Sequence, residues 1–220
     1  MAAVLCDVDG TLVDSTYLHT VCWWQALAEA GHRVLMTDIH AAVGMGADQL
    51  VPHLLGRAPD ADEADSLADG HDRLFRPYWD RLQPTTGATE FVRACAEQQW
   101  SVVLVSSAGA EELGALRRAI NADDAITAAT SADDVATSKP APDLVHRALD
   151  LVSSKPGDAV LVGDTVWDIQ AASRAGVTCI ALACGGTSAN ELLAAGAEAV
   201  YAHPAALLAE LLSSPLARLG

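Results

Sequence analysis

The sequence is poor in basic residues. Its 220 residues include 13 lysines and arginines against 29 aspartates and glutamates, which gives a formal net charge of -16. Nucleic-acid backbones and anionic membrane surfaces bind proteins through clustered positive charge, and this chain has the opposite sign. We therefore expect neither nucleic acid nor a membrane as a partner.

Long apolar segments are also missing. Charged or helix-breaking residues interrupt every apolar stretch before the ~20 residues that a membrane-spanning helix needs. The mean hydropathy of +0.22 therefore indicates a core rich in alanine, valine and leucine. Met1 to Cys6 lead directly into Asp7, without the basic and apolar regions of a signal peptide. We expect a cytoplasmic protein.

The cysteines show no paired spacing. There are five of them, and no two form a Cys-x-x-Cys pattern. This excludes the usual signatures of a disulfide framework or a thiolate zinc site. We expect buried free thiols at Cys6, Cys22, Cys95, Cys179 and Cys184.

What the sequence does contain is an alternation of short apolar runs with helical segments. The expected strands are Val4–Val8, Val102–Val105, Ala125–Ala128, Val160–Val162, Thr178–Ala183 and Ala199–Ala202. The expected helices between them are Gly87–Gln98, Ala141–Val152, Thr165–Ala175 and Pro204–Leu212. Nearly continuous apolar strands are typical of parallel sheets buried on both faces. The alternation therefore predicts an α/β fold made of parallel βαβ units.

Residues 15–83 break this alternation because they contain no strand-like run. The expected helices are Ser15 or Thr16 to Ala30, Thr37–Val43, Ala47–Leu55 and Ala61–Leu82, the last weakened at Gly70 and Pro77. In the first of them, the apolar residues that recur every three positions are Leu18, Val21, Trp24 and Leu27. We expect a helical domain over 15–83 and a core domain over 1–14 and 84–220. An insert after the first strand lies over the strand C-termini, where open α/β sheets bind ligands.

Acidic residues follow two of the expected strands. Asp7 and Asp9 come at the end of the first strand and project to the same side of an extended backbone. Asp164 ends the fourth strand, and Asp168 lies one helical turn further along. Two of these have ordinary structural alternatives, since Asp9-Gly10 is a common turn and an acid such as Asp168 favours the first turn of a helix.

Two further polar features occur at comparable places. Ser106 and Ser107 follow the second strand, just before a helix, where hydroxyl and N–H groups bind phosphate. The alternative is that Ser106 only caps its own helix. Lys139 is one of only two lysines and stands in a loop that two prolines restrict. It is either a solvated surface charge or the fixed cation that an anion site needs.

These strand ends are expected to meet at one edge of the sheet. Carboxylates gathered there repel one another unless a hard divalent cation lies between them. An all-oxygen site that also takes phosphate suits Mg²⁺. No histidine or cysteine cluster competes as a zinc site.

The order and spacing of four motifs carry a resemblance to a known family. They are Asp-x-Asp-Gly-Thr-Leu from Asp7, the strand-end Ser106, Lys-Pro-x-Pro-Asp from Lys139, and Gly-Asp-x-x-x-Asp around Asp164. On these residues the chain resembles the haloacid dehalogenase (HAD) superfamily, in its helical-cap branch of phosphatases and phosphomutases, over essentially its whole length. The resemblance implies a Rossmann-like parallel-sheet core with helices on both faces, and a smaller all-helical cap.

The resemblance also implies roles for these residues. Asp7 would be the nucleophile that forms an aspartyl-phosphate, and Asp9 the general acid and then base. Ser106, Ser107 and Lys139 would bind the phosphoryl oxygens. Mg²⁺ would be held by Asp7, Asp164 and the backbone carbonyl of Asp9, and Asp168 would complete or orient the metal site.

Two differences between this sequence and particular members of the family narrow the range of expected reactions. The sugar phosphomutases carry a cap arginine for a second phosphate, whereas Val43–Gln49 contains no cation. The dehalogenases lack the second aspartate of the first motif, whereas Asp9 is present. We expect a Mg²⁺-dependent phosphatase acting on a small phosphorylated metabolite. A phosphosugar mutase and a catalytically idle binding protein are the alternatives.

Other residues are less informative. His19 stands in the first cap helix, near the hinge, at a place from which it can approach the site. Trp23, Trp24, Tyr78 and Trp79 either line a substrate pocket or, more commonly for such spacing, belong to the core.

Overall fold

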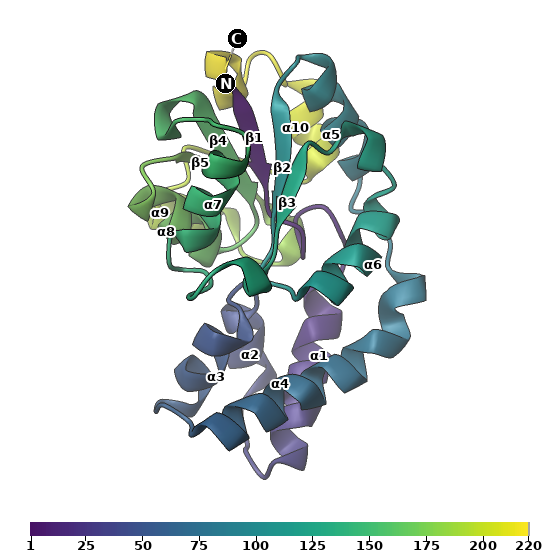
Figure 1. Cartoon of the computed structure of the whole chain (residues 1–220), viewed down its shortest axis with the longest axis vertical. Helices are drawn as coiled ribbons and strands as arrows, with labels where there is room; N and C mark the ends of the chain where they lie inside the picture. The colour runs from purple at the N-terminus through teal and green to yellow at the C-terminus, as the bar shows by residue number, and fades with distance from the viewer. Residues whose placement is uncertain (220) are drawn as a thin grey trace.

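The computed structural model describes residues 1–219 and contains a six-stranded parallel sheet. Its strands are β1 Ala3–Cys6, β2 Ser101–Val105, β3 Ala128–Thr130, β4 Ala159–Gly163, β5 Thr178–Leu182 and β6 Ala199–Tyr201. They lie in the order β3-β2-β1-β4-β5-β6, so β1 has β2 and β4 as neighbours. The predicted α/β class is therefore confirmed (Figure 1).

Helices of the core follow the strands. They are α5 Ala88–Glu97, α6 Ala110–Ile120, α7 Asp143–Leu151, α8 Val166–Arg174, α9 Ala189–Ala195 and α10 Pro204–Ala209. The helices of the insert are α1 Thr16–Glu29, α2 Met36–Ala42, α3 Ala47–Leu55 and α4 Ala61–Phe75. Short 3₁₀ helices lie at Arg76–Arg81, Asp123–Ala125, Ala132–Asp134, Pro156–Asp158, Ala183–Gly185 and Pro215–Leu219. Within residues 1–219 no helix is long and apolar enough to cross a membrane.

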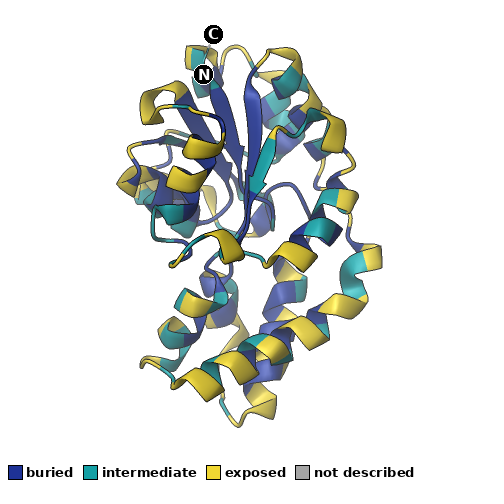
Figure 2. Ribbon diagram, in the orientation of Figure 1, coloured by how far each residue is buried: buried dark blue, intermediate teal, exposed yellow. Residues whose placement is uncertain are grey.

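Alternate residues of each strand pack on opposite faces of the sheet. Val4 and Cys6 of β1 join the core cluster that includes residues of α5, α6 and α10. Ala3 and Leu5 join the cluster that includes residues of α7, α8 and α9. The period of two in a strand produces this division, and both faces are covered (Figure 2). The sheet is therefore apolar throughout and presents its polar residues only at its ends.

The helical insert has a small core of its own. Leu27 of α1, Ile39 of α2, Leu50 of α3 and Leu67 of α4 are fully or almost fully buried together. Figure 1 shows these helices below the carboxyl ends of the strands. We keep the division into a helical domain at 15–83 and a core at 1–14 and 84–220 as a proposal.

The apolar residues spaced three apart in the first helix do not share one buried face. Val21 and Trp24 are 40% and 46% exposed, whereas Trp23 is buried. The reason is geometric, since three steps of three residues turn a 3.6-residue helix by only ~300° each, so the direction drifts by about half a circle between Leu18 and Leu27. A spacing of three residues therefore does not follow one face of an α-helix.

Three other expectations need correction. The third strand covers Ala128–Thr130 instead of Ala125–Ala128, because a 3₁₀ turn at Asp123–Ala125 precedes it. The expected helix Ala61–Leu82 ends as an α-helix at Phe75 and continues as a 3₁₀ helix with Pro77 near its start, because proline cannot donate an α-helical hydrogen bond. Helix α9 was not predicted, although Ser188 and Glu191 form a capping box at its start.

The prediction of buried free thiols is confirmed for four cysteines and is wrong in the burial of Cys184. All five cysteines are free, and four are buried, while Cys184 is partly exposed.

Candidate active site

The sheet order brings the predicted motifs together. Asp7 follows β1, Ser106 follows β2 and Asp164 follows β4, and these three strands are neighbours. All three residues are at least 95% buried. Lys139 reaches the same point from the loop before α7. Residues of the four motifs therefore lie together at one edge of the sheet, as predicted.

Asp7, Asp164 and Asp168 form a compact group of carboxylates. One carboxylate oxygen from each lies within 4.8 Å of the others. Asp164 accepts a hydrogen bond through Oδ1 from Thr11 Oγ1 at 2.7 Å. Its Oδ2 is buried and has no hydrogen-bond partner among residues 1–219. A buried oxygen without a donor is costly unless a ligand supplies the missing interaction.

The pKa values of these carboxyl groups also indicate a site suited to a cation. Burial, the charge of Asp168 and that of Asp9 raise the pKa of Asp7 to about 7, although Lys139 opposes the shift. Burial and the charges of Asp7 and Asp168 raise the pKa of Asp164 well above its ordinary value. These carboxyls have more negative charge around them than one lysine offsets, and a bound divalent cation would supply the missing positive charge.

Glycine leaves room beside the free oxygen of Asp164. A Cβ atom on Gly185 would lie 1.6 Å from Asp164 Oδ2, and one on Gly10 would lie 2.4 Å from it. Either distance is impossible, so only glycine fits at these positions. The close approach that these glycines allow, the unpartnered oxygen and the all-oxygen donor set together fit Mg²⁺. The residues present are therefore suited to the predicted metal.

Lys139 is the cation of the site and is fully buried. Its Nζ donates to Asp7 Oδ1 at 2.5 Å and to the backbone oxygen of Val105 at 2.7 Å. It also forms an ion pair with Asp168 Oδ1 at 2.8 Å. Burial alone would lower the pKa of Lys139, but the carboxylates of Asp168 and Asp7 raise it above its ordinary value. The lysine therefore stays charged, and it is no solvated surface residue.

Asp168 is held by the start of its own helix. Its Oδ2 accepts from the backbone nitrogen of Thr165 at 3.1 Å and from Thr165 Oγ1 at 2.6 Å, while Oδ1 faces Lys139. Oδ2 is thus hydrogen-bonded, whereas Oδ1 makes the ion pair with Lys139 but no hydrogen bond among residues 1–219. This arrangement orients Lys139, and a metal role for Asp168 stays a prediction.

Asp9 lies beside the helical insert. It accepts from Ser15 Oγ at 2.5 Å and pairs with His19 Nε2 at 3.0 Å. Burial would raise the pKa of Asp9, but His19 and the Ser15 hydroxyl lower it below its ordinary value. His19, for which only an approach to the site was expected, therefore contacts the predicted acid and base directly.

Two histidines extend this contact into a chain. His19 Nδ1 lies 3.0 Å from His71 Nε2, and His71 Nδ1 lies 3.1 Å from Asp72 Oδ1. Burial lowers the pKa of His71 to about 4, so this ring is neutral and donates to Asp72 through Nδ1. His19 must then donate through Nδ1 as well as to Asp9. Two donating nitrogens make it an imidazolium, in agreement with its pKa, which burial would lower but Asp9 raises.

The two serines occupy different positions. Ser106 is fully buried, and its Oγ accepts from the backbone nitrogen of Ala108 at 3.0 Å. Ser107 lines the cavity and donates through Oγ to the backbone oxygen of Gly44 at 3.3 Å. Phosphate binding by these serines stays a prediction.

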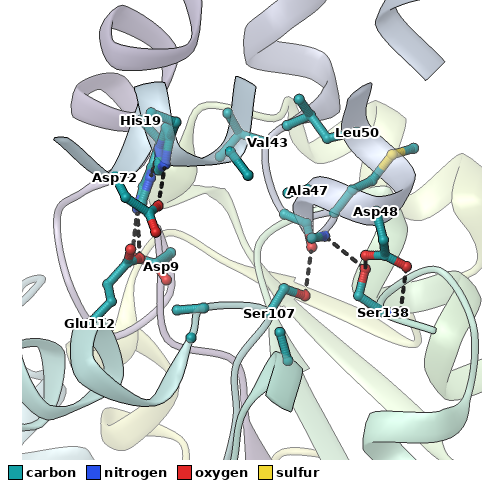
Figure 3. A pocket seen from close by; sticks show the side chains of 18 of the residues that line it. Asp9, His19, Val43, Ala47, Asp48, Leu50, Asp72, Ser107, Glu112 and Ser138 are labelled. Carbon is teal, nitrogen blue, oxygen red and sulfur yellow. Dashed lines mark hydrogen bonds and ion pairs between the residues drawn. The ribbon is translucent and has the colours of Figure 1, made fainter. Parts of the chain in front are cut away.

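A cavity of about 290 Å³ connects the carboxylates with the helical insert (Figure 3). Its core side includes Asp7, Asp9, Ser107 and Glu112, and its other side includes Trp23 among residues of the insert. Such a volume suits a small ligand. Trp24 is exposed, and Tyr78 and Trp79 pack against the main core. Of the four aromatic candidates, only Trp23 lines the cavity.

Sequence reasoning missed His71, Asp72 and Glu112. His71 lies 52 positions from its partner His19, and no local pattern joins the two. Glu112 sits in the first turn of α6, where acids are common for reasons of helix stability alone. Only the packing of α1 and α4 against the core identifies these residues.

Comparisons with known proteins agree with this geometry. Residues 1–176 match the family described as haloacid dehalogenase-like hydrolase. The chain is 29% identical over 214 residues to a phosphoglycolate phosphatase of Yersinia pestis, covering 92% of this chain and 89% of that protein. It is 28% identical to the chloroplastic protein Suppressor of Quenching 1 of Arabidopsis thaliana, over 83% of this chain but only 18% of that protein's length. The crystal structure of a hydrolase from Pseudomonas syringae superposes with a TM-score of 0.92 at 27% identity, covering 97% of this chain and 99% of the other.

Proposed function

The chain belongs to the haloacid dehalogenase-like hydrolase family, and we propose that it is a Mg²⁺-dependent phosphatase that hydrolyses small phosphomonoesters through an aspartyl-phosphate at Asp7. The main support for this proposal is that one cavity contains two carboxylates, Asp7 and Asp9, each held by a different basic side chain. Asp7 is held by Lys139, and Asp9 is held by His19. Relatives named as phosphoglycolate phosphatases support the same reaction class.

In the first step, a carboxylate oxygen of Asp7 attacks phosphorus, and the bond between phosphorus and the ester oxygen breaks. Asp9 delivers a proton to the departing alkoxide, so the alcohol leaves neutral. Since Asp9 has a lowered pKa, the proton of the resting site lies on His19 Nε2, 3.0 Å from the carboxylate. His19 is therefore the nearest proton source for Asp9.

In the second step, Asp9 takes a proton from water, and the water oxygen attacks phosphorus of the aspartyl-phosphate. Phosphate leaves and the Asp7 carboxylate is restored, so the net reaction is ester plus water to alcohol plus phosphate. Splitting the displacement in this way replaces one difficult step by two easier ones. Lys139 offsets the charge of the phosphoryl oxygens in both steps.

Asp7, Asp164 and the backbone carbonyl of Asp9 would hold Mg²⁺, with Asp168 orienting the site. When bound, the ion supplies positive charge against the phosphoryl oxygens. A mutase needs a grip on a second phosphate, and the cavity lining contains no lysine or arginine. A hydrolase is therefore favoured over the mutase alternative.

The test is phosphate release from p-nitrophenyl phosphate by the purified chain with MgCl₂. We expect activity that EDTA abolishes and Mg²⁺ restores, and that Asp7→Asn lowers to background. Asp150→Asn is the matched control, since Asp150 is an exposed aspartate on α7. Activity that survives in Asp7→Asn overturns the assignment of Asp7 as the nucleophile. Bisphosphate-dependent isomerisation without phosphate release supports the mutase alternative instead.

A further inference from the structure

The cavity combines an anion-handling centre with a leaving-group side whose one charged histidine, His19, is already paired with Asp9. No lysine or arginine is among the residues that line it within 1–219. The carboxylates of the lining beyond Asp7 and Asp9 are Asp48, Asp72 and Glu112. The remaining side is apolar and includes Val43 and Leu50. A substrate's charged groups beyond the phosphate therefore meet several carboxylates and no lysine or arginine of this lining.

The two cations nearest the cavity are already engaged. Lys139 is fully buried, and its three N–H donors face Asp7, Asp168 and the backbone oxygen of Val105. His19 uses one nitrogen for Asp9 and the other for His71. Neither has a donor left for a second anionic group of a ligand. Pairing such a group would require breaking one of these buried contacts, which is costly.

The position of Asp9 decides where the alcohol lies. Asp9 protonates the departing oxygen, so the alcohol must sit on its side of phosphorus. Figure 3 shows Glu112 and Asp72 on that side, next to Asp9 and His19, with Asp48 across the cavity beside Ser138. Glu112 Oε1 lies 3.7 Å from His19 Nε2.

Glu112 is an acceptor directed at this place. Its residue is 8% exposed, and its carboxyl makes no hydrogen bond among residues 1–219, beyond the longer ion-pair contact with His19. Because this carboxyl lines the cavity, its oxygens are open to a hydrogen bond from a ligand. In neither protonation state does it carry a positive charge. Asp72 is more open and adds a second carboxylate at the mouth of the cavity.

We propose that this enzyme selects phosphomonoesters whose leaving alcohol donates hydrogen bonds and carries no negative charge, and that it discriminates against alcohols bearing a carboxylate or a second phosphate. The inference rests on the proposed phosphatase activity. A hydroxyl or ammonium group of the alcohol bonds to Glu112 and Asp72. A carboxylate at the same place meets the acidic side chains of Glu112 and Asp72, while the neighbouring His19 is already paired with Asp9, and such mismatched charge is a means of rejecting a ligand. Phosphoglycolate, the substrate in the printed names of several relatives, is such a rejected ester.

Three esters of equal length test this selection. They are 2-hydroxyethyl phosphate, phosphoethanolamine and phosphoglycolate, whose two-carbon alcohols end in a hydroxyl, an ammonium and a carboxylate. With the full chain and saturating Mg²⁺, we expect kcat/KM for each of the first two to exceed that for phosphoglycolate by about tenfold or more. Equal or faster hydrolysis of phosphoglycolate overturns the inference. Failure to hydrolyse any ester, p-nitrophenyl phosphate included, overturns the proposed function instead.

Reversing the charge of Asp72 tests whether this side of the cavity causes the substrate selection. Asp72→Lys places a cation at the mouth of the cavity, and we expect it to raise kcat/KM for phosphoglycolate relative to 2-hydroxyethyl phosphate by about fivefold or more. Asp65→Lys is the matched control, because Asp65 is also exposed on α4 but lies two turns, ~10 Å, along the helix. The control should keep the ratio of the unmodified protein. A ratio unchanged in Asp72→Lys, or changed equally in both variants, overturns the role given to this side of the cavity.

Discussion

At the scale of single residues, Lys139 has the largest consequences because it joins Asp7, the proposed nucleophile, to Asp168. Its ammonium group lies between two buried carboxylates. Removing one member of a buried ionic group leaves uncompensated charge, which destabilises a protein far more than the intact group stabilises it. The same lysine is predicted to bind the phosphoryl group.

Lys139→Met is therefore expected to affect both stability and rate. The free energy of unfolding should fall by about 3 kcal/mol, and kcat for p-nitrophenyl phosphate by about 100-fold or more. Urea unfolding and steady-state kinetics measure the two effects. Lys155→Met is the control, since Lys155 is the chain's other lysine and is exposed. Equal effects from both variants would refute the special role of Lys139.

Gly185 offers a second test at this scale. A Cβ atom there would overlap Asp164 Oδ2, so Gly185→Ala must displace the carboxylate that is predicted to hold Mg²⁺. We expect the Mg²⁺ concentration for half-maximal activity to rise about tenfold or more. Titration calorimetry with MgCl₂ should show the same weakening without any substrate.

Gly157→Ala is the matched control for that measurement. A Cβ atom on Gly157 would meet nothing within 4 Å, so this variant should bind Mg²⁺ as the unmodified chain does. Unchanged Mg²⁺ affinity in Gly185→Ala would mean that Asp164 is not a ligand.

At the scale of elements, helix α8 links its own stability to the chemistry of the site. Thr165 caps the helix and also holds Asp168, which in turn orients Lys139. A capping residue contributes about 1 kcal/mol to stability. Here the same interactions also set the position of Lys139.

Thr165→Ala should therefore lose activity as well as stability. We expect the free energy of unfolding to fall by about 1 kcal/mol and kcat by about tenfold. Ser188→Ala removes the equivalent capping box from α9, away from the cavity lining. It should cost similar stability and leave kcat unchanged, and a parallel loss of kcat in Ser188→Ala would contradict the link.

At the scale of the whole molecule, the helical insert is fastened to the core by a few polar contacts. The backbone nitrogen of Gly46 donates to Ser138 Oγ at 3.0 Å, and the Ser138 hydroxyl donates to Asp48. Trp167 Nε1 donates to the backbone oxygen of Ala41 at 2.8 Å. These contacts close the cavity on the side of the segment Val43–Asp48.

Ser138→Ala tests this fastening. Two hydrogen bonds of about 1 kcal/mol each are lost, so amide exchange in residues 43–48 should accelerate about tenfold or more, with a higher KM for the substrate. Hydrogen exchange followed by mass spectrometry gives the first value, and kinetics give the second. Ser154→Ala, whose hydroxyl bonds to the backbone oxygen of Met1, should change neither. Unaltered exchange in Ser138→Ala would show that other contacts hold the segment.

Local patterns were enough to predict the parallel sheet and the meeting of Asp7, Lys139 and Asp164. The physical reason is that parallel strands end at one edge, so a polar residue after each buried apolar run must arrive at the same place. The boundaries of β3 and of α4 were less accurate, because a 3₁₀ turn and a proline altered them locally.

Only the tertiary packing determines which residues surround the cluster of Asp7, Lys139 and Asp164. His71, Asp72 and Glu112 come from α4 and α6, and nothing in their own neighbourhood marks them as part of a site. They are connected to Asp9 through His19, which contacts Asp9 and Glu112 through Nε2 and His71 through Nδ1. The charge that an approaching alcohol meets depends on distances between elements, which no local pattern encodes.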